Sequence, residues 1–88
     1  MKIRKIQISV AVQEKIFKKH GLKRAEIEAV FFDAPYYFKM RARYLAMGCI
    51  GKYITVVFEY NNKVAEIITA YQSSLWQKRL YKAKQWNK

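Results

Sequence analysis

The sequence is poor in the residues that build disulfides and metal sites. Its 88 residues include one cysteine, one histidine, one proline and three glycines. A single thiol, Cys49, cannot form an internal disulfide, which fits a reducing compartment. One histidine and one cysteine cannot make a zinc site, and the scattered carboxylates argue against a magnesium site. We therefore expect no metal and no other cofactor.

Long apolar runs are also missing. The first six residues carry positive charges, but no apolar stretch of signal-peptide length follows them. Nothing approaches the ~20 consecutive apolar residues that a membrane helix needs. We expect a soluble, cytoplasmic protein without a membrane partner. Because so short a chain has room for only one core, residues 1–88 are expected to form a single domain.

Acidic residues are scarce as well. Six Asp and Glu oppose 18 Lys and Arg, which gives a formal net charge of +12. The last acidic residue is Glu66, and the basic residues beyond it are Lys78, Arg79, Lys82, Lys84 and Lys88. Such a charge favours association with polyanions, so nucleic acid or an acidic protein is the natural partner. A ribosomal-type structural protein is equally basic, and composition leaves that alternative open.

The hydrophobic period is helical at both ends of the chain and alternating in the middle. It predicts a helix over 10–20, capped by Ser9 and ended by Gly21, and a second helix over 24–32 that Pro35 stops. Strands are expected over 36–41, 42–49, 52–60 and 64–71. Short turns between them predict an antiparallel sheet of three or four strands.

A last helix is expected over 74–85, capped by Ser73 and Ser74. Its apolar stripe should lie on the sheet and consists of Leu75, Trp76, Leu80, Ala83 and Trp86. The fold class is therefore α+β, with two N-terminal helices, the antiparallel sheet and a C-terminal helix.

A series of short motifs runs along most of the chain. In order, they are Lys19-His20-Gly21, Glu28, Val30-Phe31-Phe32-Asp33-Ala34-Pro35, Arg43-Tyr44-Leu45-Ala46-Met47-Gly48, Tyr53-Ile54-Thr55-Val56-Val57-Phe58-Glu59, Ile67-Ile68-Thr69-Ala70 and Lys78-Arg79-Leu80-Tyr81. Their order and spacing resemble the BrnT-like ribonuclease toxins of bacterial toxin–antitoxin pairs. The resemblance implies a RelE/ParE-like fold, ribonuclease activity that arrests growth, and a cognate antitoxin.

Two positions depart from the family pattern. Tyr71 stands where the family usually has an arginine after the penultimate motif, and Gln77 stands where it usually has a glutamate in the last helix. If that arginine stabilises the transition-state phosphate, the activity of this chain is weakened, taken over by another residue, or absent.

RNA cleavage by the 2′-hydroxyl without a metal needs a proton acceptor, a cation for the phosphorane and a proton donor. Arg43 shares a strand face with Leu45, and its planar fork suits a phosphate. Glu59, on a neighbouring strand, either pairs with Arg43 or acts as a base. Lys19 offers a second phosphate contact.

Proton transfer is assigned to His20 and Tyr81. Histidine ordinarily exchanges protons near neutral pH, although His20 also falls in the apolar arc of its helix, so a structural role is equally open. Tyr81 lies among cations that should favour its phenolate. The residues expected to contact substrate are Tyr71, Gln77, Lys78, Arg79 and Lys84.

These observations predict a metal-independent endoribonuclease toxin whose partners are RNA and an acidic cognate antitoxin. Association with the ribosome stays open. The alternative is a non-catalytic basic module that binds RNA or a partner protein through the same surface. A DNA-binding regulator is disfavoured, because no helix-turn-helix signature is present.

Overall fold

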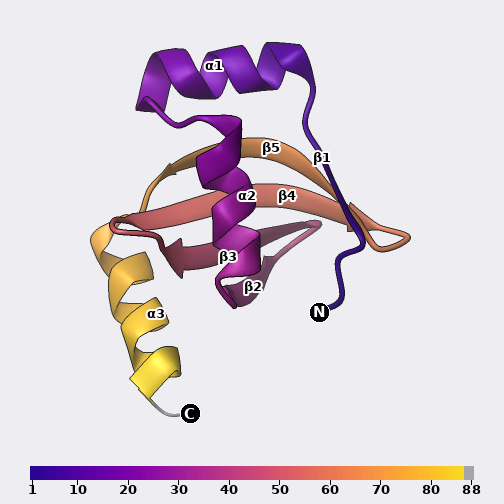
Figure 1. Cartoon of the computed structure of the whole chain (residues 1–88). Helices are drawn as coiled ribbons and strands as arrows, with labels where there is room; N and C mark the ends of the chain where they lie inside the picture. The colour runs from indigo at the N-terminus through magenta and orange to yellow at the C-terminus, as the bar shows by residue number, and fades with distance from the viewer. Residues whose placement is uncertain (87–88) are drawn as a thin grey trace.

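The computed structural model describes residues 1–86 and, for Trp86, only its place in a helix. Its three helices are α1 (Val10–His20), α2 (Arg24–Phe32) and α3 (Leu75–Trp86) (Figure 1). Its five strands are β1 (Lys5–Gln7), β2 (Tyr36–Met40), β3 (Arg43–Cys49), β4 (Tyr53–Asn61) and β5 (Val64–Gln72). The predicted α+β fold class is confirmed. No helix in the described part of the chain is long and apolar enough to span a membrane.

Local signals set the ends of α1 and α2. The hydroxyl of Ser9 accepts a hydrogen bond from the Val12 N–H at 3.2 Å, which caps the start of α1. Gly21 has a φ of 67°, a left-handed value that suits glycine, and ends the same helix. The start of α2 has no such cap, and instead the Glu26 carboxylate accepts the Lys23 N–H at 2.9 Å.

The sheet has five strands in the order β1-β5-β4-β3-β2. Strands β2 to β5 form the predicted antiparallel meander. The sheet is nevertheless mixed, because β1 pairs in parallel with β5, where Ile6 lies opposite Ala65. The prediction of an antiparallel sheet of three or four strands was therefore wrong, because it left out β1 and its parallel pairing. Its pairing depends on a contact that is distant in sequence, since Arg4 donates its N–H to the carbonyl of Lys63 in the β4–β5 turn.

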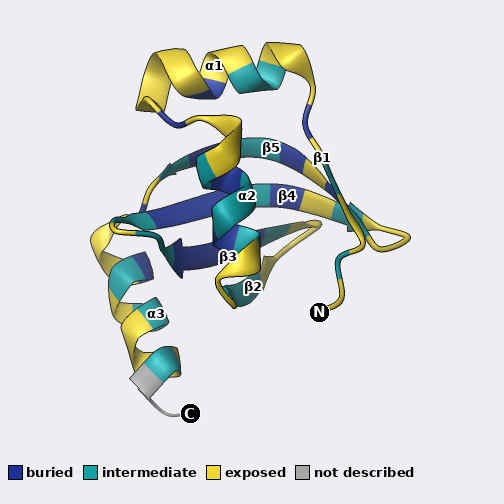
Figure 2. Cartoon of the chain, in the orientation of Figure 1, coloured by how far each residue is buried: buried dark blue, intermediate teal, exposed yellow. Residues whose placement is uncertain are grey.

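One face of the sheet is covered by α1 and α2 and carries the hydrophobic core. We call it the covered face. Helix α1 packs against β5, and α2 packs against β3 and β4. Buried side chains from both layers meet there, among them Ile16, Ile27, Val56 and Phe58. The rest of α1 is mostly exposed (Figure 2), including Phe17.

The opposite face, which we call the open face, is covered only in part. Helix α3 contacts it at β2 and β3. The predicted apolar stripe of α3 does not become core, since Leu75 is 62% exposed and Trp76 is 46% exposed. The buried residue in the described part of α3 is Gln77, at 2% exposure, because hydrogen bonds anchor the helix to β4. Trp86, also placed in that stripe, lies outside the described side chains.

Candidate functional site

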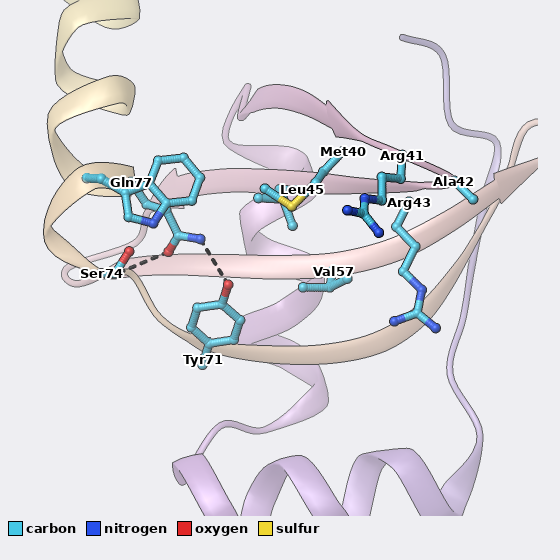
Figure 3. A pocket seen from close by; sticks show the side chains of 10 residues that line it. Met40, Arg41, Ala42, Arg43, Leu45, Val57, Tyr71, Ser74 and Gln77 are labelled. Atoms are coloured by element: carbon cyan, nitrogen blue, oxygen red, sulfur yellow. Dashed lines mark hydrogen bonds between the residues drawn. The ribbon is translucent and has the colours of Figure 1, made fainter.

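The uncovered part of the open face forms a hollow of about 710 Å³ between the β2–β3 turn and the start of α3 (Figure 3). Its floor is apolar and includes Leu45 of β3 and Val57 of β4, which lie opposite each other in the sheet. Met40 and Trp76 also line it, and each is 46% exposed. The hollow therefore combines an apolar floor with exposed large side chains.

One end of the hollow is cationic. Arg41 and Arg43 extend from the β2–β3 turn (Figure 3). Arg43 is the first residue of β3, is exposed, and faces the same side as Leu45, as the strand alternation predicted. The described residues contain no ion pair between Arg43 and Glu59, the pairing that the sequence had left open. Both guanidinium groups are therefore available to an anion.

The other end of the hollow carries a chain of hydrogen bonds. The amide nitrogen of Gln77 donates to the hydroxyl oxygen of Tyr71 at 2.9 Å (Figure 3). The amide oxygen of Gln77 accepts from the hydroxyl of Thr55 at 3.0 Å and from the Ser74 N–H at 2.9 Å. Behind them, the hydroxyl groups of Thr55 and Ser73 lie 2.7 Å apart. The two positions that depart from the family pattern thus contact each other directly.

His20 and Lys19 belong to the last turn of α1, and both are exposed. The imidazole of His20 lies beside Tyr71, with ring centroids 6.1 Å apart. His20 is therefore outside the core and next to the Tyr71 end of the hollow. This contact joins residues that are far apart in the sequence.

Tyr81 does not line the hollow. Its ring lies 6.1 Å from that of Tyr53. Burial raises the pKa of Tyr81, and the nearby carboxylate of Asp33 raises it further. The expectation that cations would favour its phenolate was therefore wrong, because loss of solvent disfavours the charged form.

The cations of α3 form a second basic surface around tyrosine rings. The ammonium groups of Lys78 and Lys82 lie 5.9 Å and 5.2 Å from the ring centroid of Tyr53. The ammonium group of Lys84 lies 5.6 Å from the ring centroid of Tyr36. Arg79 is exposed on the same helix. The predicted substrate-binding residues therefore fall into two groups: Tyr71 and Gln77 in the hollow, and Lys78, Arg79 and Lys84 along α3.

Sequence reasoning missed several parts of this site. Arg41 gave no signal because it was read as the end of a strand, whereas it occupies the β2–β3 turn with a φ of 57°. Trp76 was assigned to the core on its helical spacing. Thr55 looked like an ordinary strand residue, and only its buried hydroxyl shows that it belongs to the polar network.

No cluster of three or more His, Cys, Asp or Glu side chains within residues 1–86 could hold a metal ion. The remaining chemistry of the hollow comes from two guanidinium groups, a phenol, an amide and a neighbouring imidazole. Arginine binds phosphate oxygens with paired hydrogen bonds, and exposed aromatic rings stack on nucleobases. The site therefore has the groups that a strand of nucleic acid requires.

The architecture is similar to that of a solved BrnT structure, which confirms the resemblance seen in the sequence. That structure is BrnT, a ribonuclease toxin of Brucella abortus, which is similar to this chain with a TM-score of 0.67 and 26% sequence identity. The similarity covers 80% of this chain and 96% of that one. No protein-family model matches the sequence, and the search of curated proteins finds no match.

Proposed function

We propose that the protein is a metal-independent endoribonuclease toxin that binds RNA across the hollow of its open face. The observation that carries the proposal is the hollow itself, in which two arginines that form no ion pair among the described residues lie across an apolar floor from a tyrosine. The fold similarity to a ribonuclease toxin supports the same activity. The net charge of +12 adds a general attraction for the RNA backbone.

In the proposed reaction, the 2′-oxygen of a ribose attacks the adjacent phosphorus. The bond to the 5′-oxygen breaks, which leaves a 2′,3′-cyclic phosphate and a 5′-hydroxyl. We place the scissile phosphate over Val57, between Arg43 and Tyr71, which lie toward opposite ends of the hollow (Figure 3). Arg43 stabilises the charge that builds up on the phosphorane, and Arg41 supports it.

Proton transfer requires a group that takes the 2′-hydroxyl proton and a source for the proton that the 5′-oxygen gains. His20 is our candidate for this exchange because it lies beside Tyr71. Lys19, in the same helical turn, contacts a neighbouring phosphate. Tyr81 is left out of the reaction, since it does not line the hollow and burial raises its pKa.

A cognate antitoxin of acidic character is the proposed protein partner. Its carboxylates would approach Lys19, Arg43 and the basic residues of α3, and would keep RNA out of the hollow. Association should therefore weaken as salt is raised. Antitoxin binding that does not depend on salt concentration and leaves these residues accessible would contradict this part of the proposal.

The activity is tested by incubating the purified protein with a structured RNA in excess EDTA, with and without ribosomes, and identifying the ends of the products. We expect cleavage that persists in EDTA and yields 2′,3′-cyclic phosphate ends. Activity that EDTA abolishes and magnesium restores would overturn the metal-independent scheme.

The second candidate function is a binding module that retains the fold without cleaving RNA. The observation in its favour is that Tyr71 and Gln77 are both neutral, whereas the family usually has an arginine and a glutamate at these positions. Such a module would bind RNA with a steep salt dependence but would leave it intact in every condition above.

A further inference from the structure

We infer that Tyr71 presents its hydroxyl proton to the RNA as a hydrogen-bond donor, and that Gln77 is the positioning residue that fixes this direction. The inference rests on the proposed function and assigns separate roles to the two positions that depart from the family pattern. It follows from the order of donors and acceptors in the network behind the hollow.

The orientation of the Gln77 amide is fixed by its neighbours. The Ser74 N–H can only donate, so the amide atom that faces it, 2.9 Å away, is the oxygen. The amide nitrogen therefore faces Tyr71, at 2.9 Å. Because an amide nitrogen has no acceptor capacity, the hydroxyl oxygen of Tyr71 must accept this hydrogen bond.

The hydroxyl protons of Thr55 and Ser73 have fixed directions as well. Thr55 has one hydroxyl proton, and the oxygen of Gln77 takes it at 3.0 Å. The 2.7 Å contact between Thr55 and Ser73 must then use the proton of Ser73. All of the donors point in one direction, from Ser73 through Thr55 and Gln77 to Tyr71. Hydrogen bonds aligned in such a chain polarise and strengthen one another.

The hydrogen-bond chain is shielded from water, and each of its buried polar atoms has a partner. Thr55 is fully buried, and Ser73 and Gln77 are 8% and 2% exposed. No buried side-chain nitrogen or oxygen in the described residues lacks a partner. Tyr71 is half-buried and lines the hollow, and no hydrogen bond of the described residues takes its proton. The proton is therefore available to an acceptor in the hollow, and a phosphate oxygen of bound RNA is such an acceptor.

A neutral donor of this kind stands at the position where the family pattern has an arginine. It cannot neutralise charge, but it is preorganised, and a preorganised donor stabilises a phosphorane oxygen without reorientation during the reaction. Replacing Gln77 by glutamate would reverse its effect, because a carboxylate oxygen would accept the Tyr71 proton and withdraw it from the RNA.

The test is a double-mutant cycle on Tyr71→Phe and Gln77→Glu, with kcat/KM for RNA cleavage as the readout. Tyr71→Phe should lower kcat/KM by roughly 10- to 100-fold in the wild type, the size expected for a hydrogen bond to a charged group. In the Gln77→Glu background, the same change should alter it by less than about twofold, because the hydroxyl is already withdrawn. The added negative charge is common to both arms of that background and cancels.

Tyr44→Phe is the matched control, since Tyr44 is a half-buried tyrosine that packs against Phe58 on the covered face. It should leave kcat/KM unchanged. An equal loss from Tyr71→Phe in both backgrounds would show that Gln77 does not set the direction. No loss in the wild type would show that the hydroxyl does not act on RNA.

Two further measurements keep the inference separable from folding and from the proposed function. If Gln77→Glu does not fold, NMR of the wild type and of Tyr71→Phe follows the side-chain amide protons of Gln77. Their chemical shifts must differ between the two proteins, and unchanged signals would overturn the assigned orientation.

If the wild type cleaves no RNA, the proposed function fails on its own. The cycle is then repeated on the affinity for a 2′-O-methyl RNA, where the same pattern of losses is expected and its absence overturns the inference.

Discussion

The two faces of the sheet are built from the same strands but differ in the contacts that their buried side chains make. On the covered face, Phe58 is fully buried, and its ring lies 5.3 to 6.1 Å from the rings of Phe31, Tyr37 and Tyr44. On the open face, the buried contacts between helix and sheet are polar and centre on Gln77. The covered face stabilises the fold, and the open face fixes the direction of individual side chains.

This difference between the faces follows from the alternation of side chains along a strand. Val57 and Phe58 are neighbours in β4, yet Phe58 joins the core while Val57 lines the hollow. Apolar packing is tolerant of sequence as long as volume is kept, whereas a hydrogen-bond chain depends on each member. Substitutions on the covered face should therefore act on stability, and substitutions on the open face should act on RNA.

The largest expected effect is that of Phe58→Ala. Loss of this fully buried ring should lower the free energy of unfolding by about 3–5 kcal/mol. Val57→Ala, one residue away, should cost much less, because Val57 is only half-buried. Urea unfolding of both variants provides the comparison. Equal losses would contradict the division between the two faces.

A smaller effect is expected from Trp76→Ala, and it should appear in RNA affinity. The indole contacts Phe38 at 6.0 Å between centroids but is 46% exposed, so stability should change by less than about 1 kcal/mol. If a nucleobase stacks on Trp76, binding of a short single-stranded RNA should weaken by about 1–3 kcal/mol. Phe17→Ala, which removes a 54% exposed ring from α1, is the control and should leave affinity unchanged. The reverse order of effects on affinity would place the stacked base on Phe17 and contradict the assignment of Trp76.

The smallest effect is expected at Glu26 in α2, the helix that packs on the covered face. The Lys23 N–H and the nearby Lys52 ammonium group lower the pKa of the Glu26 carboxyl below its ordinary value of 4.5. Because the pKa is lower in the folded state, the ionised carboxylate stabilises the fold at pH values above the ordinary pKa. This stabilisation is lost as the pH falls through the lowered pKa. Glu26→Gln should therefore cost about 0.5 kcal/mol at neutral pH and nothing in strong acid. Urea unfolding at both pH values measures this, and a loss that persists in acid would exclude the electrostatic cause.

Much of the fold could be predicted from the sequence because its signals are local. The cap at Ser9, the left-handed Gly21 and the alternation of β3 and β4 each act within a few residues. Strand β1 could not be predicted in this way. It has three residues, and its partner in β5 lies almost sixty residues further along the chain.

The site was predicted less completely, since its parts come from distant segments. Alternation correctly put Arg43 on the face of Leu45, and the family pattern drew attention to Tyr71 and Gln77. Neither could show that Gln77 is buried and bonded to Tyr71, because that depends on where α3 meets β4. The assigned roles of Arg43, His20 and Lys19 remain predictions.

The central claim is that the open face cleaves RNA, and the most direct test is the cleavage rate of Arg43→Ala beside its melting temperature. Arg43 is exposed and forms no ion pair among the described residues, so the melting temperature should stay at the wild-type value. Loss of a charge aimed at the phosphorane should lower the rate by roughly 10²- to 10³-fold. Arg24→Ala, which removes an exposed arginine from α2, should keep the wild-type rate. An Arg43→Ala protein that is folded and cleaves RNA as fast as the wild type would contradict the account.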